Sequence, residues 1–442
     1  MALREAPSPP NISLEEKISA RTAVIAVIGM GYVGLPLAVE KAKVGFTVIG
    51  IEQKAERMDM INAGQNYISD VDDKELAELV SAGRIRATND CSVLAEADVV
   101  IICVPTPLDA ARDPDISYIV STAEEIAKRL RRGQLVVLES TTFPGTTEEV
   151  VLPILAASGL EIGVDYFLAF SPERVDPGNK RYTTKNTSKV VGGVTASCLK
   201  AAISLYSQTI VNVVPVSSPK VAEMTKVFEN TFRAVNIALV NELALLCDKM
   251  GISIWDVVEA ASTKPFGMMR FSPGPGVGGH CIPVDPFYLT WKARQYDFHT
   301  RFIELAGEVN LQMPLFVMEK INKALNRAGK CLRGAKILIL GVAYKKDIDD
   351  ARMSPALKIM ELLVTEEADV IYNDPFIPSV TLESKSLASQ ALADLPIESF
   401  DCIVLATDHS AYPYEELATR SKLIVDTRNA FAAFAGSNIV GL

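Results

Sequence analysis

Short apolar runs rich in Val and Ile alternate with helical patterns from residue 22 to about residue 215. Continuous apolar strands separated by helices are typical of a parallel sheet that is covered on both faces. Seven runs predict strands: Ala23–Ile28, Thr47–Ile51, Val99–Val104, Leu135–Glu139, Tyr166–Phe170, Lys189–Gly192 and Asn212–Val214. The alternation indicates an α/β domain.

One long helical pattern follows. Ser218 can cap it, Pro219 suits its first position, and Gly251 can end it. Apolar residues recur in between at helical spacing: Val221, Met224, Phe228, Phe232, Val235, Leu239, Leu243 and Leu246. At 1.5 Å per residue the helix is roughly 48 Å long. It either spans two domains or a subunit interface, or it is a long core helix within one subunit.

Strand runs resume at Ala335–Leu340, Asp369–Tyr372, Cys402–Leu405 and Leu423–Asp426. The fold class that we predict is α/β, with two doubly wound parallel-sheet domains joined by a central helical domain. The predicted parts are a flexible N-terminal extension at 1–20, an α/β domain at 21–216, a helical domain at 217–329 and a second α/β domain at 330–442. The length of 442 residues agrees, because domains average roughly 150 residues.

Composition excludes several classes of protein. An apolar fraction of 49% and a charged fraction of 22% are those of a globular chain, not a disordered one. A net charge of −10 argues against general nucleic-acid binding, which needs a basic surface. The N-terminus lacks an apolar signal core, and no apolar run approaches the roughly 20 residues of a membrane helix. We therefore expect a cytoplasmic protein without a membrane segment.

The seven cysteines are irregularly spaced, and no CxxC occurs. Neither a disulfide framework nor a zinc site is indicated, and the three histidines also lack zinc spacing. We predict that no metal is bound. Reduced thiols are the ordinary interpretation, with a single reactive thiol among them as the alternative.

The first apolar run leads into Gly29-Met-Gly31-Tyr-Val-Gly34 and then a helical pattern, which is GxGxxG in a strand–turn–helix context. Gly29 permits the tight turn, Gly31 lets the backbone approach a pyrophosphate, and Gly34 lets the helix pack closely. Glu52 ends the second strand, where a carboxylate binds an adenosine ribose and repels a 2′-phosphate. The motif predicts a Rossmann-like domain that binds NAD; a tight turn without ligand is the alternative.

Three later strand ends carry polar residues: Val104-Pro105-Thr106-Pro107, Glu139-Ser140-Thr141-Thr142 and Ser171-Pro172-Glu173-Arg174. The alternative for the prolines is that they only prevent helix formation. Ligands of open α/β sheets collect at the carboxyl ends of strands. Glu173 beside Arg174 is either a salt bridge or an acid/base group.

Residues 273–286 form a Gly- and Pro-rich loop that contains His280, Cys281 and Asp285. Such a loop suits close approach of the backbone to a ligand. Cys281 there is a candidate covalent nucleophile, whereas most cysteines are small buried apolar residues. Lys226 and Asn230 lie four apart and share a face of the long helix; a solvated flank is the ordinary interpretation of that lysine.

These pieces together resemble the UDP-glucose/GDP-mannose (nucleotide-sugar 6-) dehydrogenase family, and within it most the UDP-N-acetylglucosamine 6-dehydrogenases. The matching segments are residues 29–36, 171–174, 222–231, 278–286 and 343–355. The resemblance implies four-electron, NAD-dependent oxidation of the C6 hydroxyl of a UDP-N-acetylhexosamine to a uronic acid for polysaccharide biosynthesis. It also implies a homodimer formed through the central helical domain.

The resemblance also implies roles for particular residues. Cys281 would form a thiohemiacetal and then a thioester, Lys226 and Asn230 would stabilise O6, Asp285 and Thr141 would position water, and Glu173 would assist hydrolysis. The implied NAD contacts are Gly29, Gly31, Tyr32, Val33, Gly34, Glu52, Arg57, Pro105, Thr106, Thr141 and Arg352. The implied UDP-sugar contacts are Glu173, Arg174, Lys226, Asn230, Gly278, Lys345 and Arg428, with Lys345 near the phosphates in a UDP-binding domain that lacks GxGxxG.

Departures from the UDP-glucose branch favour an N-acetylated sugar. Val284 stands where a basic residue is usual, and His280 precedes the cysteine. The Ile282-Pro283 pair favours the glucosamine type, with UDP-N-acetylmannosamine, UDP-N-acetylgalactosamine and UDP-glucose as alternatives. Two other classes of function are a two-electron dehydrogenase of the 6-phosphogluconate or 3-hydroxyacid type and a non-catalytic NAD-binding regulator. The second α/β part argues against the former, and the joint presence of Cys281, Lys226 and Asn230 argues against the latter.

Overall fold

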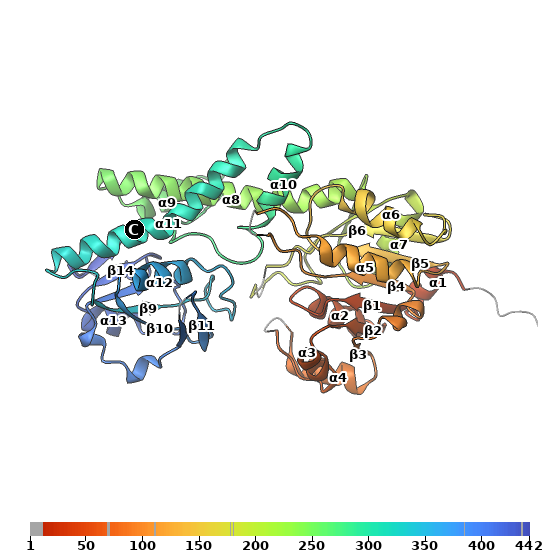
Figure 1. The fold of residues 1–442 in the computed structure, drawn as a ribbon, viewed down its shortest axis with the longest axis horizontal. Helices are drawn as coiled ribbons and strands as arrows, with labels where there is room; N and C mark the ends of the chain where they lie inside the picture. Colours follow the sequence, from red (N-terminus) through yellow and green to blue (C-terminus); the bar gives the residue numbers. More distant parts are fainter. Residues whose placement is uncertain are drawn as a thin grey trace, which may run out of the picture. The chain divides into compact units, whose positions relative to one another are not determined.

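The computed structural model describes residues 12–68, 71–109, 112–176, 178–179, 181–383, 385–434 and 436–442. The chain divides into two compact units, one up to Phe228 and the other from Glu229 (Figure 1). Each unit is built around one main parallel sheet.

The first unit contains an eight-stranded sheet in the order β3-β2-β1-β4-β5-β6-β7-β8. All neighbouring strands are parallel except β6 and β7. The strands are β1 Val24–Ile28, β2 Thr47–Ile51, β3 Ile85–Thr88, β4 Val99–Ile102, β5 Gln134–Leu138, β6 Tyr166–Phe170, β7 Lys189–Gly193 and β8 Val213–Val216. All seven predicted runs overlap strands; β3 was missed, because its alternation places Arg86 in solvent and makes the run too short and polar to stand out.

Helices cover both faces of this sheet. Side chains alternate along each strand, so successive residues pack against the helices on opposite faces. Ile25 and Val27 of β1 belong to one core cluster, whereas Ala26 and Ile28 belong to the cluster on the opposite face. The helices are α1 Leu14–Ser19, α2 Gly34–Lys43, α3 Ala55–Asn62, α4 Asp73–Ser81, α5 Ser117–Ala127, α6 Leu152–Ala156 and α7 Ala196–Tyr206. The unit is therefore doubly wound, as predicted.

The N-terminal segment differs from the prediction. Residues 14–19 form α1 instead of a flexible extension, and the Ser13 and Glu16 side chains form a reciprocal capping box at its start. Leu14 and Ile18 are buried in the core of the first unit, so burial of two apolar side chains fixes this short helix. Residues 1–11 of the predicted extension lie outside the described residues.

The long helix predicted from periodicity is α8 Pro219–Met250, which has 32 residues. It is followed by α9 Ile254–Ser262, α10 Asp285–Arg294 and α11 Arg301–Arg327. Within the described residues, no helix is both long and apolar enough to cross a membrane.

The second unit contains a parallel sheet in the order β10-β9-β13-β14-β15. Its strands are β9 Lys336–Leu340, β10 Asp369–Asn373, β13 Cys402–Leu405, β14 Ile424–Asp426 and β15 Ile439–Gly441, with a small hairpin of β11 Ser379–Thr381 and β12 Ser386–Ala388. Ile337 and Ile339 pack with α11 and α12 Pro355–Thr365, whereas Leu338 and Leu340 face the cluster that includes Leu417 of α13 Tyr414–Arg420. This second covered parallel sheet confirms the predicted fold class.

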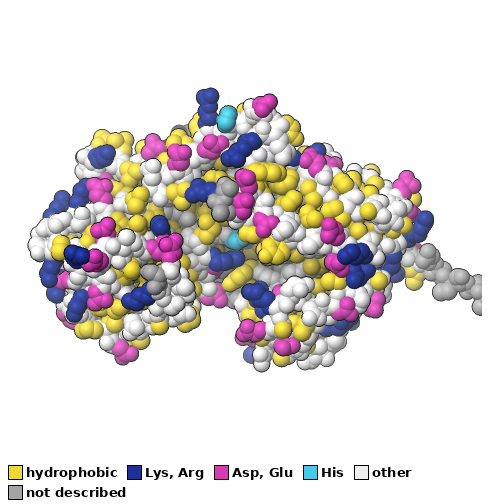
Figure 2. Space-filling view, viewed as in Figure 1, with side chains coloured by type: hydrophobic (Ala, Val, Ile, Leu, Met, Phe, Trp, Pro, Cys, Tyr) yellow, Lys and Arg dark blue, Asp and Glu magenta, His cyan; other side chains and the backbone are white. Residues whose placement is uncertain are grey.

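Charged side chains of both signs are interspersed over the face of the molecule that Figure 2 shows. No large patch of one sign stands out there.

Candidate active site

The three glycines of the turn between β1 and α2 differ in what surrounds them. Gly29 has φ +89°, and an added Cβ would lie 2.6 Å from the Cys103 carbonyl oxygen. A Cβ on Gly34 would lie 1.9 Å from the Gly29 carbonyl oxygen, so α2 starts in backbone contact with the turn. Gly31 instead faces open space, with nothing within 4 Å of the same position. Open space beside a helix N-terminus fits the pyrophosphate of NAD.

Glu52 follows β2 and is buried, and its carboxylate accepts a hydrogen bond of 2.9 Å from the Lys54 amide. Nearby, the Tyr67 hydroxyl donates to the Met30 carbonyl of the glycine turn. The Arg57 guanidinium lies 5.2 Å from the Tyr67 ring centroid, a cation–π distance. Tyr67, which sequence reasoning missed, thus connects Arg57 of α3 to the turn.

The other predicted cofactor contacts lie in neighbouring loops of the first unit. Tyr32 and Val33 belong to the glycine turn, and Val33 is the N-cap residue of α2. Pro105 and Thr106 follow β4, and Thr141 follows β5. The Thr106 hydroxyl donates to the Thr141 carbonyl at 2.7 Å, so the two strand-end loops are in contact.

Glu173 lies in the loop after β6, and its carboxylate has three hydrogen-bond donors. The amides of Arg174 and Val175 each donate to Oε1 at 2.8 Å, and Nζ of Lys189 donates to Oε2 at 3.1 Å. The Arg174 guanidinium donates to the Ser188 carbonyl at 2.7 Å. Arg174 therefore braces the loop against the residue before β7, and among the contacts of the described residues the cation paired with Glu173 is Lys189.

Lys189 opens β7 and is buried between two carboxylates. Its Nζ lies 2.7 Å from Glu139 Oε2 and 3.1 Å from Glu173 Oε2. The Tyr206 hydroxyl of α7 donates to the other oxygen of Glu139. A buried ammonium is tolerated because it is paired on both sides.

The pKa values of the two carboxylates in this group are shifted in opposite directions. Burial raises the pKa of Glu139, although Lys189 opposes the change. Burial also acts to raise the pKa of Glu173, but the charges of Lys189 and Lys226 and the Val175 amide hold it below its usual range. The physical reason is that nearby cations and donated hydrogen bonds favour the ionised form. Glu173 is therefore the carboxylate of the pair that stays ionised.

Glu223 anchors the start of α8 to the loop after β5. Its buried carboxylate accepts from the amides of Gly145 and Thr147, the latter at 2.8 Å, and from the Thr147 hydroxyl at 2.7 Å. This loop carries Thr141, and Lys226 lies three residues beyond Glu223, just under one turn of the helix. The contact fixes the helix segment that bears Lys226 relative to a predicted cofactor loop within the first unit.

In the second unit, the cysteine loop packs on the segment that follows β9. A Cβ on Gly278 would lie 2.6 Å from Cβ of Tyr344, and Gly279 has φ +85°. The Gly279 amide donates to the Arg352 carbonyl at 2.9 Å. Cys281 itself is exposed. Glycine is required here because two backbones approach closely, and the result is a thiol held open to solvent.

Asp285 and Asn230 are brought together, as two predicted catalytic residues. Both are buried, and the Asn230 amide donates to Asp285 Oδ2 at 2.5 Å. Asp285 is the first residue of α10, and its amide donates to the Cys281 carbonyl at 2.8 Å. The four-residue spacing in the sequence therefore reflects the start of α10, where the Asp285 amide bonds to the Cys281 carbonyl.

His280 is half-buried, and burial lowers its pKa. The positive charge of Arg352 lowers it further, whereas Asp350 acts in the opposite direction. The Arg352 guanidinium donates to both carboxylate oxygens of Asp350, at 2.7 to 3.0 Å. The neutral imidazole is thus favoured, and Arg352 is oriented by its own loop.

The predicted phosphate contacts lie on two strand-end loops of the second unit. Lys345 follows β9, where Asp374 accepts from the amides of Val342 and Ala343 at 2.7 and 2.9 Å. Arg428 follows β14, and its Nε donates to the Ala406 carbonyl at 2.8 Å. Burial lowers the pKa of Arg428, although two aspartates oppose this. Both loops are fixed by carboxylates or carbonyls of the same unit.

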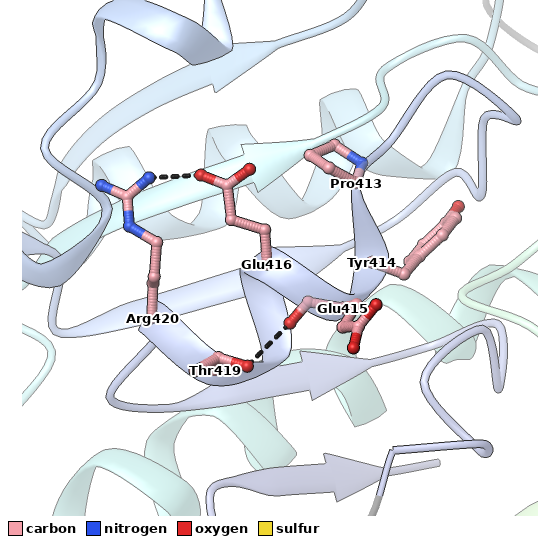
Figure 3. Close-up of a pocket in the computed structure, with 6 residues that line it drawn as sticks. All are labelled: Pro413, Tyr414, Glu415, Glu416, Thr419 and Arg420. Atoms are coloured by element: carbon pink, nitrogen blue, oxygen red, sulfur yellow. Dashed lines mark hydrogen bonds and ion pairs between the residues drawn. The ribbon is translucent and has the colours of Figure 1, made fainter.

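A hollow of about 630 Å³ along α13 contains none of the predicted site residues. It is lined by Pro413, Tyr414, Glu415, Glu416, Thr419 and Arg420. Figure 3 shows Arg420 directed at Glu416, with which it forms an ion pair of 2.5 Å. Arg420 also pairs with Glu398, and the Tyr414 hydroxyl donates to the His409 carbonyl, so these side chains serve contacts within the second unit and none of the predicted site residues lines the hollow.

Sequence reasoning missed Lys189, Glu223 and Asp374 as parts of these sites, and it placed Glu139 at a strand end without giving it a role. One signal was available: Lys189 begins an otherwise apolar strand run, and a charged residue in a buried strand must be paired. Its partners lie 50 and 16 residues away. No local pattern identifies them.

Comparison with known proteins agrees with this geometry. Residues 23–210 match the NAD binding domain of the UDP-glucose/GDP-mannose dehydrogenase family, residues 220–312 its central domain and residues 338–433 its UDP binding domain.

Individual relatives agree over nearly the whole chain. The chain is 37% identical over 411 residues to UDP-N-acetyl-D-mannosamine dehydrogenase from Pyrococcus horikoshii, covering 92% of this chain and 95% of that one. It is 38% identical over 393 residues to UDP-N-acetyl-D-glucosamine 6-dehydrogenase from Pseudomonas aeruginosa, covering 88% and 91%. A solved structure of UDP-D-ManNAc dehydrogenase from Pyrococcus horikoshii matches with a TM-score of 0.85 at 35% identity, covering 95% and 98%. The chain therefore belongs to the UDP-glucose/GDP-mannose dehydrogenase family and is an NAD-dependent nucleotide-sugar dehydrogenase.

Proposed function

We propose that the protein oxidises the C6 hydroxyl of UDP-N-acetylglucosamine to the carboxylate, in two oxidations that pass through a covalent adduct on Cys281. The observation that carries this proposal is the environment of Cys281, an exposed thiol in a glycine-built loop immediately before the buried Asn230–Asp285 pair. An exposed thiol with fixed polar groups beside it is suited to nucleophilic catalysis.

The thiol makes the second oxidation chemically accessible. Addition of the Cys281 sulfur to the C6 aldehyde gives a thiohemiacetal, a tetrahedral carbon that again bears both a hydrogen and an oxygen. Loss of that hydrogen as a hydride gives a thioester, and water then cleaves the C–S bond to give the uronic acid and the free thiol. NAD, when bound, accepts the hydride in each oxidation.

The other catalytic residues act on oxygen and water. Lys226 and Asn230 stabilise the negative charge that develops on O6, because an ammonium and an amide N–H are oxyanion donors. Asp285 and Thr141 position the hydrolytic water. Glu173, whose pKa is held below its usual range against the effect of burial, is ionised at neutral pH and serves as its base.

Binding roles follow the two units. In the first unit, NAD contacts the glycine turn, including Tyr32 and Val33, the carboxylate of Glu52, Arg57 and the loops at Pro105 to Thr106 and Thr141. In the second unit, Gly278, Lys345 and Arg428 contact the UDP-sugar, and Arg352 contacts NAD. Arg174 assists Glu173 at the sugar by bracing its loop against Ser188.

The choice of UDP-N-acetylglucosamine is supported by the Ile282-Pro283 pair after the cysteine and by the relative from Pseudomonas aeruginosa. The mannosamine relative is equally similar, so UDP-N-acetylmannosamine is the second candidate, followed by UDP-N-acetylgalactosamine and UDP-glucose. Initial rates of NADH formation with these four sugars test the choice. We expect kcat/KM to be at least about tenfold higher for UDP-N-acetylglucosamine, since polar epimer contacts discriminate strongly.

We further propose a homodimer formed through the central helices. Large apolar side chains of α8 are exposed at helical spacing, among them Phe228 at 61%, Leu239 at 54% and Leu246 at 52%. An exposed apolar stripe of this length marks an interface. Sedimentation should give twice the chain mass of 47.9 kDa, and a monomer at micromolar concentration would contradict this.

Replacement of Cys281 tests the covalent step. Cys281→Ser should lower complete turnover by at least about 10³-fold, because a neutral hydroxyl is a much weaker nucleophile than a thiolate and cannot form a thioester. Substrate binding should change less than about threefold, measured by calorimetry. Cys331→Ser is the matched control, since Cys331 is also exposed, and it should retain full activity. Two NADH per UDP-sugar at the normal rate in Cys281→Ser would contradict the mechanism.

A further inference from the structure

The buried group around Lys189 joins four elements of the first unit. Glu139 stands at the end of β5, Glu173 in the loop after β6, Lys189 on β7 and Tyr206 on α7. All three charged side chains are at least 85% shielded from solvent, at 0%, 15% and 4% exposure respectively. Nothing in the proposed reaction requires Glu139 or Lys189 to touch substrate. Burying their charges nevertheless carries a desolvation penalty, which suggests that the group has a role.

The group formed by Lys189, Glu139 and Glu173 carries a net negative charge when all three side chains are ionised. One ammonium faces two carboxylates, so a proton taken up by the group must go to one of the two. Burial raises the pKa of Glu139, whereas Glu173 keeps a lowered pKa because Lys189, two backbone donors and Lys226 favour its anion. The geometry agrees, since Glu139 receives a hydroxyl donor from Tyr206 and one bond from Lys189 but no backbone amide among the hydrogen bonds described.

Charged and titratable groups reach Glu173 from several neighbouring elements. Lys189 approaches from β7 and Lys226 from α8, and both favour the anion. Glu139 at the end of β5 is a second carboxylate, and its negative charge, when it is ionised, disfavours the Glu173 anion. The Cys103 thiol after β4 is half-buried, and desolvation raises its pKa and keeps it neutral. Lys189 is the only one of these that is shown in direct contact with the Glu173 carboxylate in the described residues.

We propose that Lys189 is a positioning residue that holds Glu173 ionised and oriented as the base for hydrolysis of the Cys281 thioester, with Glu139 as the partner that moderates its charge. The proposal rests on the proposed function. In the step concerned, water oxygen bonds to the acyl carbon while one water proton passes to Glu173. The C–S bond then breaks, and its electron pair leaves on the Cys281 sulfur.

Two substitutions should move the pH dependence of hydrolysis in opposite directions. Glu139→Gln keeps an acceptor for Tyr206 and leaves Lys189 paired with Glu173 alone, so the acid limb should shift to lower pH. Adding Lys189→Met to Glu139→Gln removes the ammonium without stranding a second carboxylate, and the limb should shift upward by about one unit or more. Lys189→Arg should restore a profile within about 0.5 unit of the wild-type protein, because the charge remains.

The measurement is the decay of the acyl-enzyme in single turnovers of full-length protein with UDP-N-acetylglucosamine and NAD, followed by intact mass. The double variant should accumulate acyl-enzyme on the acid side of its shifted limb and hydrolyse it there about tenfold more slowly than wild type, while the first NADH forms at a rate within about twofold of wild type. Lys41→Met is the matched control: Lys41 is the other buried lysine beside the Tyr206 ring, at 4.5 Å, and bonds Thr209 instead of Glu173. Its variant should lose stability but keep the acid limb.

The outcomes separate this proposal from the one on which it rests. Glu173→Gln should stall hydrolysis at every pH; normal decay there would overturn the role of Glu173 in the proposed function. If Glu173→Gln stalls but Glu139→Gln and the double variant share the wild-type pH profile, the role of Lys189 is overturned. Glu139→Gln preserves the shape and the hydrogen-bonding groups of the cluster, so its downward shift remains measurable even if the double variant does not fold.

Discussion

The two α/β regions begin their first loops in the same way and then diverge. Each first strand ends in a glycine with positive φ, Gly29 at +89° and Gly341 at +79°. In the first region α2 begins at Gly34, directly after the turn, and Gly31 faces open space. In the second region α12 begins only at Pro355. The first loop is thus a short anion cradle, whereas the second is a long loop with room for other contacts.

An internal carboxylate explains why the second loop does not act as the first does. Asp374 of the second region accepts from the amides of Val342 and Ala343, the groups that follow Gly341. It also contacts buried His409, at 3.0 Å. Backbone amides that already bind a carboxylate are not available to a pyrophosphate. Two similar sheets therefore serve two different ligands, NAD in one and the UDP end of the substrate in the other.

The largest effect should come from the glycine that the fold needs. Gly34→Ala places a Cβ 1.9 Å from the Gly29 carbonyl oxygen, so it should destabilise the first region by about 3 kcal/mol and abolish NAD binding. Gly31→Ala meets nothing within 4 Å and should change stability by less than about 0.5 kcal/mol while weakening NAD about tenfold. Urea unfolding and NAD titration distinguish the two; equal stability losses would remove the distinction between fold and ligand glycines.

The next effect should come from the internal carboxylate. Asp374→Asn should destabilise the second region by about 2 kcal/mol, because charged hydrogen bonds to two amides and His409 are weakened. Burial acts to raise the pKa of Asp374, but His409 and the backbone amides lower it below its usual range. Its contribution is therefore complete above an unfolded-state pKa of about 3.9 and is lost as pH falls through the lower folded value.

Thermal unfolding from pH 7 to pH 3 checks this sign. The difference between wild type and Asp374→Asn should stay constant down to about pH 4 and shrink in more acidic solution. NAD affinity should be unchanged, since it belongs to the first region. A difference that grows on acidification would contradict the assignment.

The smallest effect should come from the proposed phosphate lysine. Lys345→Met should raise KM for the UDP-sugar about tenfold, or about 1.4 kcal/mol, while KM for NAD stays within about twofold. Lys346→Met is the matched control, because Lys346 is exposed and lies 3.8 Å from Asp408. Its KM values should not change. An increase in KM for NAD in Lys345→Met would mean that the two regions do not divide the ligands as proposed.

Local patterns predicted much of the fold. Continuous Val- and Ile-rich runs identified the central strands, and the caps at Pro219 and Gly251 predicted α8 to within a residue. The edge strand β3 and helix α1 were missed, because each is short and gains its stability from packing. Propensity alone cannot predict such elements.

The sequence by itself determined the features that depend on neighbours along the chain. These are the glycine turn at 29–34, the carboxylate at the end of β2 and the spacing of Cys281 to Asp285, which a helix start enforces. Only the tertiary structure decided which distant charges meet. Lys189 pairs with Glu139 and Glu173, and Asp374 meets the loop after β9, because strand register and sheet order bring strand ends together. Burial then sets their pKa shifts, since desolvation depends on what surrounds a charge.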